Sequence, residues 1–69
     1  MSELTPMIRA FLFEAGTQGR TQREVFKRFQ YIPQEELLTE LHALWSEERV
    51  QRFSVKKTFV WRATDKFNV

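Results

Sequence analysis

The side chains with the clearest chemistry in this sequence are two groups of lysines and arginines. The first group comprises Arg20, Arg23, Lys27 and Arg28. The second comprises Arg49, Arg52, Lys56, Lys57, Arg62 and Lys66. Between the groups, residues 33–48 contain five glutamates and no Lys or Arg. Because ammonium and guanidinium groups bind phosphate oxygens, this uneven charge favours a polyanion as partner on one side of the protein. The alternative is that both charge runs are solvated faces without a partner.

The other polar residues do not form a catalytic or metal-binding set. With no cysteine and one histidine, His42, the chain has no thiolate ligands, and we expect no zinc site within it. The serines lie in no nucleophile motif, and the two glycines, Gly16 and Gly19, do not form a phosphate-binding loop. A body of 69 residues also has little room for a cleft. We therefore predict no enzymatic activity, cofactor or small-molecule substrate.

The chain length predicts a single domain, and the hydropathy predicts no membrane-spanning segment. No run approaches the roughly 20 apolar residues that a membrane span needs. The start lacks the basic leader of a signal peptide, and Arg9 interrupts its apolar run. We expect a cytoplasmic protein, associated with the nucleoid, or a nuclear one in a eukaryotic host. A single domain should occupy residues 1–69, with residues 1–4 and 64–69 frayed unless Phe67 packs back.

Two helices are predicted in the first half. Thr5-Pro6 is typical of a helix start, and Gly16 of a helix end. The stripe between them contains Ile8, Phe11, Leu12 and Ala15. Thr21 and Glu24 then form a capping box that opens a second helix ending near Gln30. The segment 18–20 between the helices is short enough to be a turn or one paired rung of a sheet.

A third helix and two strands are predicted in the second half. Pro33 stops the second helix at Ile32 and begins a third that runs to Trp45, with a stripe at Leu37, Leu41 and Leu44. Trp45, at the border of that stripe, is expected in the core. The segments 50–55 and 58–63 have strand composition. Neither residue of the connecting Lys56-Lys57 favours positive φ, so we expect a longer or mobile loop there.

This order of elements resembles the winged helix-turn-helix family over nearly the whole chain. The matching segments are Ile8-Arg9-Ala10-Phe11-Leu12, Thr21-Gln22-Arg23-Glu24-Val25, Pro33-Gln34-Glu35-Glu36-Leu37, Leu41-His42-Ala43-Leu44 and Phe59-Val60-Trp61-Arg62. The spacing is similar to that of small single-module members, including the Zα type. The resemblance implies an α+β fold in which three helices are followed by a two-stranded β-hairpin wing. Of the three Zα ligand positions, which fall here on Leu38, His42 and Trp61, only the tryptophan matches, so left-handed nucleic acid is not predicted.

The resemblance implies a small transcriptional regulator that binds double-stranded DNA. The third helix would enter the major groove and the wing would follow the backbone. Contacts to bases or phosphates would come from Gln34, Thr39, His42 and Ser46. Contacts to the backbone would come from Arg20, Arg23, Lys27, Arg28, Arg52, Lys56, Lys57, Trp61 and Arg62.

An alternative is a protein-interaction or dimerisation module. Glu35, Glu36 and Glu40 would be driven toward a polyanion if the third helix entered a groove. That acidic helix, with Trp45, Phe13 and Tyr31, would instead suit a protein surface. A homodimer would combine both hypotheses, because paired recognition helices need two half-sites.

Overall fold

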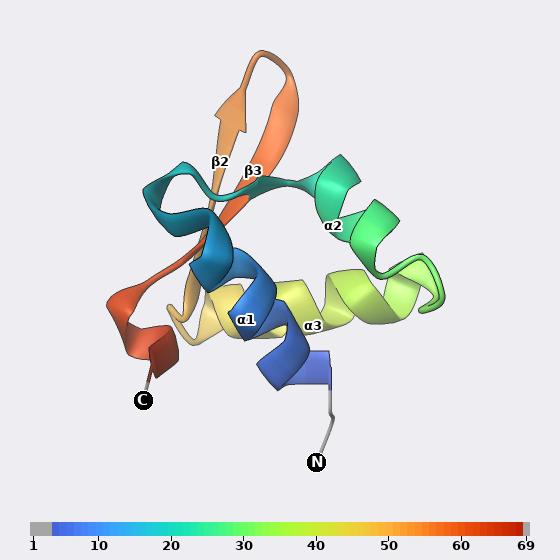
Figure 1. Cartoon of the computed structure of the whole chain (residues 1–69), viewed down its shortest axis with the longest axis horizontal. Coiled ribbons are helices and arrows are strands. Elements are labelled where there is room, and N and C mark those ends of the chain that lie inside the picture. The colour runs from blue at the N-terminus through green and yellow to red at the C-terminus, as the bar shows by residue number, and fades with distance from the viewer. Residues whose placement is uncertain (1–3, 69) are drawn as a thin grey trace.

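The computed structural model describes residues 4–68, and Figure 1 shows their arrangement. The expected fraying of residues 1–3 and Val69 lies outside the described residues, whereas Leu4 is helical and packs against the core, so its expected fraying is wrong. The elements, in chain order, are α1 (Leu4–Ala15), the 3-10 turn η1 (Gly16–Gln18), β1 (Arg20–Thr21), α2 (Gln22–Arg28), α3 (Gln34–Ser46), β2 (Val50–Val55), β3 (Thr58–Ala63) and the 3-10 turn η2 (Asp65–Asn68). All three predicted helices and both predicted strands are therefore present, and the α+β class is confirmed.

The sheet has three antiparallel strands in the order β1-β3-β2. The predicted hairpin is present as β2 and β3, but the two-stranded description is incomplete because β1 adds a third strand. The segment after η1 does form a paired rung, in which Arg20 pairs with Trp61 and Thr21 with Val60. Gly19 makes this pairing possible, because a Cβ at that position would lie 2.6 Å from the Trp61 carbonyl oxygen. A two-residue strand has no alternation of its own, which is why its pattern does not identify it.

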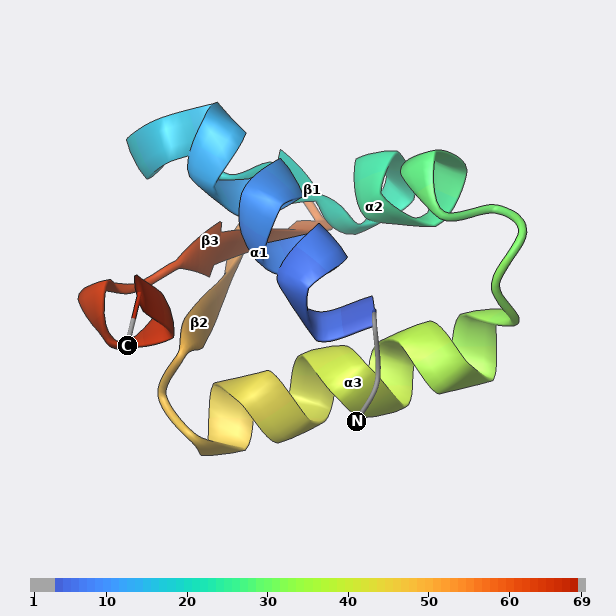
Figure 2. The same ribbon diagram turned by 60° about the horizontal axis from the view of Figure 1, so that its bottom comes forward.

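The core lies where the three helices meet the inner end of the β2–β3 hairpin. In Figure 2, α1 lies above and α3 below that end of the hairpin. The buried cluster comprises Ile8, Leu12, Val25, Phe29, Leu37, Leu41, Leu44, Val50, Trp61 and Phe67. Burial of Phe67, which is 2% exposed, fixes the C-terminal turn η2 against the core. Residues 64–68 are therefore not frayed. The alternative that we named for them, in which Phe67 packs back onto the core, is the one observed.

The ends of the helices follow local hydrogen-bond rules. The end of α3 is a Schellman motif, in which the Glu48 N–H donates to the Trp45 carbonyl (2.9 Å) and the Arg49 N–H to the Leu44 carbonyl (2.8 Å). Glu48 has φ 62° there. Three predicted boundaries shift slightly. The first helix already includes Leu4, so it begins before the predicted Thr5 cap. The second helix ends at Arg28, not near Gln30, and Pro33 caps α3 without belonging to it.

The predicted capping box of α2 is confirmed. The Glu24 N–H donates to the Thr21 hydroxyl (3.1 Å), and the Thr21 N–H donates to the Glu24 carboxylate (2.9 Å). We expect Thr21→Ala to lower the free energy of unfolding by about 1 kcal/mol, because it leaves a helix N–H without its partner. In a thermal melt this is a fall of about 4–8 °C for a domain of this size. Thr21→Ser, which keeps the hydroxyl, is the control, and equal melting of both variants would contradict the assignment.

The hairpin turn contradicts the expectation of a longer or mobile loop. Val55 pairs with Thr58, so Lys56 and Lys57 alone make the turn. Their φ angles are 50° and 66°, as a two-residue type I′ turn requires. Each L-residue in this region costs roughly 1–2 kcal/mol relative to right-handed backbone. The two lysines are therefore held in a conformation that asparagine and glycine adopt more readily.

Candidate nucleic-acid interface

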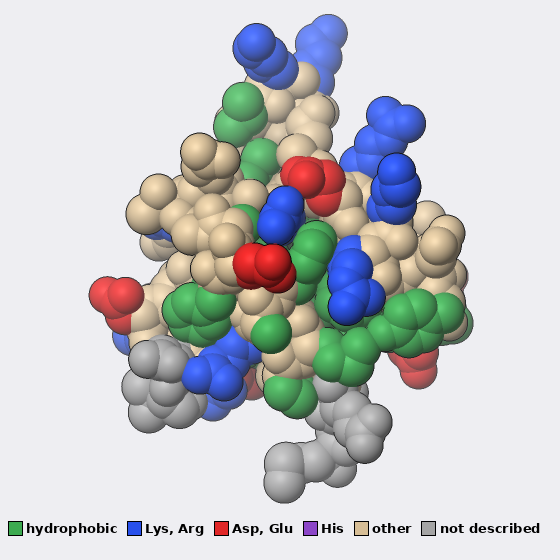
Figure 3. All heavy atoms as spheres, in the orientation of Figure 1, with side chains coloured by type: hydrophobic (Ala, Val, Ile, Leu, Met, Phe, Trp, Pro, Cys, Tyr) green, Lys and Arg blue, Asp and Glu red, His purple; other side chains and the backbone are tan. Residues whose placement is uncertain are grey.

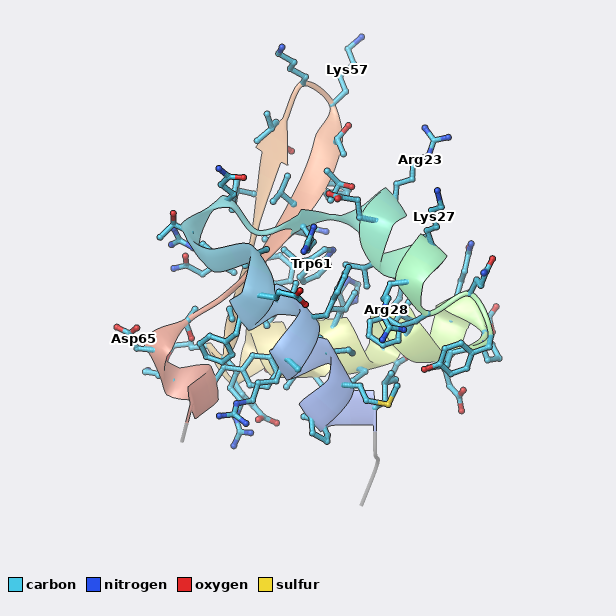
Figure 4. The ribbon with its side chains drawn as sticks, in the orientation of Figure 1. Arg23, Lys27, Arg28, Lys57, Trp61 and Asp65 are labelled. Atoms are coloured by element: carbon cyan, nitrogen blue, oxygen red, sulfur yellow. The ribbon has the colours of Figure 1, made fainter. Side chains whose placement is uncertain are left out.

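Four exposed cations gather at one end of the molecule, on α2 and on the tip of the β2–β3 hairpin. They are Arg23, Lys27, Lys56 and Lys57. Figure 4 shows Arg23, Lys27 and Lys57 projecting toward the same end of the molecule, with Asp65 far from them. In the space-filling view, Lys and Arg side chains cover the hairpin tip and the outer side of α2 (Figure 3). No ion pair between described residues involves any of these four, so their charge is open to a ligand.

The two other arginines of the first basic group are less available. Arg20 is half-buried, with its Nη1 3.6 Å from the Glu24 carboxylate and its guanidinium carbon 4.7 Å from the Phe11 ring centroid. The guanidinium carbon of Arg28 lies 5.2 Å from the Phe29 ring centroid, although the residue is exposed. Both arginines therefore pack on the aromatic residues of α1 and α2, and Arg28 keeps the more accessible charge.

The glutamates of α3 lie mainly on one flank of the helix. At about 100° per residue, Glu36, Glu40 and Glu47 fall on the flank opposite Leu38, His42 and Trp45. The Glu40 carboxylate accepts a hydrogen bond from the Thr5 hydroxyl of α1. Glu36 and Glu40 line a hollow of about 520 Å³ with Leu4, Ile32, Glu35 and Thr39. The flank that carries His42 is therefore free of these three carboxylates, but Glu35, seven residues before His42 and about 20° from it around the helix, lies on that flank.

The polar residues predicted for base contacts on α3 differ in how available their side chains are to a ligand. Gln34, His42 and Ser46 are exposed. Thr39 is exposed too, but its hydroxyl donates to the Glu35 carbonyl at 2.8 Å, which occupies its donor within the helix. His42 packs beside two tryptophans, with its ring centroid 6.1 Å from that of Trp45 and 5.9 Å from that of Trp61. The contact with Trp61 places His42 beside the hairpin.

An arginine and two exposed aromatic rings join α3 to the hairpin. The guanidinium carbon of Arg52 lies 4.3 Å from the Trp45 ring centroid and 4.2 Å from the Phe59 ring centroid. Trp45 is 39% exposed and Phe59 is 40% exposed. We call Trp45, Arg52 and Phe59 the aromatic platform. The expected burial of Trp45 is wrong, because α3 packs on the sheet through its leucines and leaves the border position at the surface.

Trp61 packs beneath the aromatic platform, in the core, and is not part of the exposed surface. The side chain is fully buried, and its indole N–H donates to the Gln22 side-chain oxygen at 3.2 Å. Its ring meets Trp45 edge-on, with the centroids 5.9 Å apart. The ring is therefore not available to a ligand, which corrects its assignment as a contact residue. Its position on the central strand, between β1 and β2, explains the burial.

Arg62 lies on the opposite face of the sheet from Arg52. Arg52 pairs with Trp61, whereas Arg62 pairs with Gln51, and paired residues share a face. The Arg62 guanidinium donates to the Gln51 side chain, and both residues line a second hollow, of about 480 Å³, beside Phe13 and Asp65. A ligand that spans α2 and the hairpin tip would not meet Arg62, so the structure separates it from the other predicted contacts.

Sequence reasoning missed Gln22 and Phe59 as members of this region. Phe59 alternates with Trp61 on one strand, so the two rings share a face of β3. That alternation was available as a signal, but it does not tell which end of the strand the helices cover. The bond from Trp61 to Gln22 joins residues 39 positions apart, and no local pattern predicts it.

No family model, curated protein or solved structure matches this chain. Among residues 4–68, no cluster of three or more His, Cys, Asp or Glu side chains could hold a metal ion. No helix in the described part of the chain is long and apolar enough to cross a membrane.

Two carboxylates in the described chain should make stability depend on pH. The hydrogen bond from the Thr21 backbone N–H lowers the pKa of Glu24 below its ordinary 4.5, with Arg20 adding to the effect. The Lys66 ammonium does the same for the pKa of Glu48. Because both pKa values are lower in the folded state, the stabilisation is complete above pH 4.5 and is lost as pH falls below it.

We therefore expect the midpoint of urea unfolding to fall as pH is lowered from above 4.5, and part of that fall to disappear in Glu24→Gln. Glu14→Gln is the matched control, because Glu14 is exposed and forms no ion pair with another described residue. Identical pH profiles for Glu24→Gln and the unmodified protein would refute the role of the capping box.

Proposed function

We propose that this protein is a small winged-helix-like transcriptional regulator that binds double-stranded DNA through α2, the hairpin tip and the His42 flank of α3. The observation that carries the proposal is the convergence of Arg23, Lys27, Lys56 and Lys57 without ion-pair partners among the described residues. The hairpin segment 50–63 contains four cations and no carboxylate. Charge of this kind supplies most of the sequence-independent affinity for a phosphate backbone.

The strained hairpin turn gives the proposal independent support. Lys56 and Lys57 both have positive φ, a conformation in which asparagine and glycine would be more stable. Residues held in such conformations concentrate at functional sites, where the side chain matters more than local stability. Two lysines at the outermost point of the molecule would suit contact with phosphates on either side of a groove.

The arrangement of α3 lessens the main objection to DNA binding for two of its three glutamates, although Glu35 stays on the flank of His42. Glu36 and Glu40 face the start of α1 and the hollow beside it, on the flank away from His42. A ligand held between α2 and the hairpin would therefore approach the less acidic flank. In this mode the cations of α2 and the hairpin tip supply most of the affinity, and α3 contributes through His42 and Gln34.

Fluorescence anisotropy of a labelled random duplex, with salt varied, tests this proposal. If four cations each contact a phosphate, log K should fall linearly with log salt, with a slope of about −3.6. A steep slope supports phosphate contacts, and site selection would then follow. Absence of binding at low salt would overturn the proposal and leave the alternative of a protein partner.

The acidic flank of α3 favours that alternative in one respect. Tyr31 is 63% exposed beside the corner that precedes α3, and tyrosine is enriched in protein interfaces. A partner with basic residues would suit Glu36 and Glu40. This surface lies on a different flank from the hairpin cations. Charge reversal at Glu36 should therefore lower the affinity for a protein partner without lowering the affinity for DNA.

A further inference from the structure

We infer that the aromatic platform binds an unpaired nucleobase, so that the protein prefers nucleic acid with exposed bases to a closed duplex. The inference rests on the proposed function, since the same cations would hold the backbone of the strand. It concerns Trp45 and Phe59, whose rings phosphate binding leaves without a role, and Arg52, which contacts both rings.

The geometry of the platform suits stacking. Arg52 lies against both rings, at 4.3 Å from the centroid of Trp45 and 4.2 Å from that of Phe59. Such contacts orient a planar guanidinium, which then presents its N–H groups to acceptors at its edge. Among described residues, no hydrogen bond or ion pair satisfies the Arg52 guanidinium. A base that stacks on an exposed ring would place its carbonyl oxygens, or the adjacent phosphate, within reach of those donors.

The position of the platform points to a nucleic-acid strand as the occupant. Phe59 follows Lys57 by two residues, so its ring lies in the part of β3 nearest to the hairpin tip. A strand whose phosphates contact the hairpin tip would therefore bring its bases to Phe59. Exposed aromatic rings interspersed with cations are the usual means of binding single strands, because every base has a flat apolar face. In a closed duplex the bases are stacked on one another, and the two rings would gain little.

The chain supplies a matched control for the platform. Phe53 is 38% exposed, close to the 40% of Phe59, but it pairs with Val60 and so lies on the other face of the same hairpin. Phe59→Ala and Phe53→Ala both remove one half-exposed phenyl ring from the hairpin. A difference in their affinity for nucleic acid would therefore show which face of the hairpin binds the ligand, and would not reflect the loss of a phenylalanine as such. Thermal melts of both variants verify that each is folded before binding is measured.

Anisotropy with an oligothymidine of about 12 nucleotides, and with a duplex of the same length, tests the inference. We expect tighter binding of the single strand, and a loss of roughly 5- to 150-fold in Phe59→Ala from the removal of one stacked base. Phe53→Ala should bind as the unmodified protein does. The salt slope should be unchanged in Phe59→Ala, because the phosphate contacts are intact. An oligouridine of equal length shows whether RNA or DNA is the better source of the base.

The outcomes separate the inference from the function on which it rests. Salt-dependent binding of duplex that equals or exceeds that of the single strand would overturn the inference and leave the proposed function standing. Equal effects of Phe59→Ala and Phe53→Ala would also overturn it, whatever the preferred strand. Absence of binding to both probes would overturn the two proposals together. A preference for the single strand that is lost only in Phe59→Ala establishes the platform.

Discussion

Replacing Trp61 by alanine is expected to lower the free energy of unfolding by about 3–5 kcal/mol, the largest effect of any single change considered in this protein. Trp61 is fully buried, and it is the largest of the fully buried side chains. Its removal leaves a cavity in the centre of the sheet, where β1 and β2 flank its strand. A domain of this length is stable by about 3–10 kcal/mol in total. Urea unfolding followed by far-UV circular dichroism should therefore show a midpoint at a much lower urea concentration than that of the unmodified protein.

Trp61→Phe separates the indole hydrogen bond from the packing. The phenyl ring keeps much of the buried area but cannot donate to Gln22, whose side-chain oxygen lies 3.2 Å from the indole nitrogen. We expect a loss of about 1–3 kcal/mol, because a half-buried acceptor is left without its partner. If Trp61→Ala melted like the unmodified protein and instead lost affinity for nucleic acid, Trp61 would be a surface contact, contrary to its observed burial.

The helices of this fold could be predicted because each carries its own local signals. The Thr21–Glu24 box fixes the start of α2 through bonds within four residues. The stripe Leu37, Leu41 and Leu44 identifies the buried face of α3 from its spacing alone. These features need no information from distant parts of the chain, so a pattern in the sequence is sufficient to identify them.

The features that could not be predicted depend on distant partners. The hairpin turn is the clearest case. Local preference opposes positive φ at Lys56 and Lys57, yet the strand register that pairs Val50 with Ala63 also pairs Val55 with Thr58. Because a slip by one residue would turn the buried side chains of both strands outward, register overrides the preference of the turn. The strand β1 is likewise defined by its partner and by the close approach at Gly19.

The sequence predicted many of the residue types in the candidate site, but not which of these side chains lie together on one face. Alternation along a strand shows that Arg52 and Arg62 face opposite ways when their partners are known, but not which face looks toward α3. The two tryptophans exchange their expected roles for a similar reason. Trp45 lies at the border of a helical stripe, and Trp61 lies in a strand that was expected to be an exposed wing. The burial of each tryptophan therefore depends on how the hairpin packs against the helices, which no local pattern shows.

Exchange of Lys56 and Lys57 for glutamate is expected to abolish retention of duplex DNA at physiological salt while leaving the fold intact. Both side chains are exposed at the tip of the hairpin, so their reversal removes two phosphate contacts and adds repulsion without disturbing the core. Loss of binding after charge reversal has a trivial explanation, however, since any strongly acidic tip repels a polyanion. A neutral variant is therefore the sharper test.

Lys56→Asn with Lys57→Gly is that variant, because the turn conformation predicts opposite effects on stability and on binding. Asn-Gly is the preferred pair for a type I′ turn. Relief of the positive φ is partly offset, because asparagine keeps some of the cost and glycine loses more chain entropy on folding, so we expect the free energy of unfolding to rise by about 1 kcal/mol. The loss of two charges should reduce the salt slope by about 1.8 and weaken duplex binding by about 10- to 100-fold at low salt. A more stable protein that binds DNA less tightly would show that the two lysines serve the ligand at the expense of the turn. Unchanged affinity and slope would instead exclude the hairpin tip as a contact, because the variant alters nothing else on that surface.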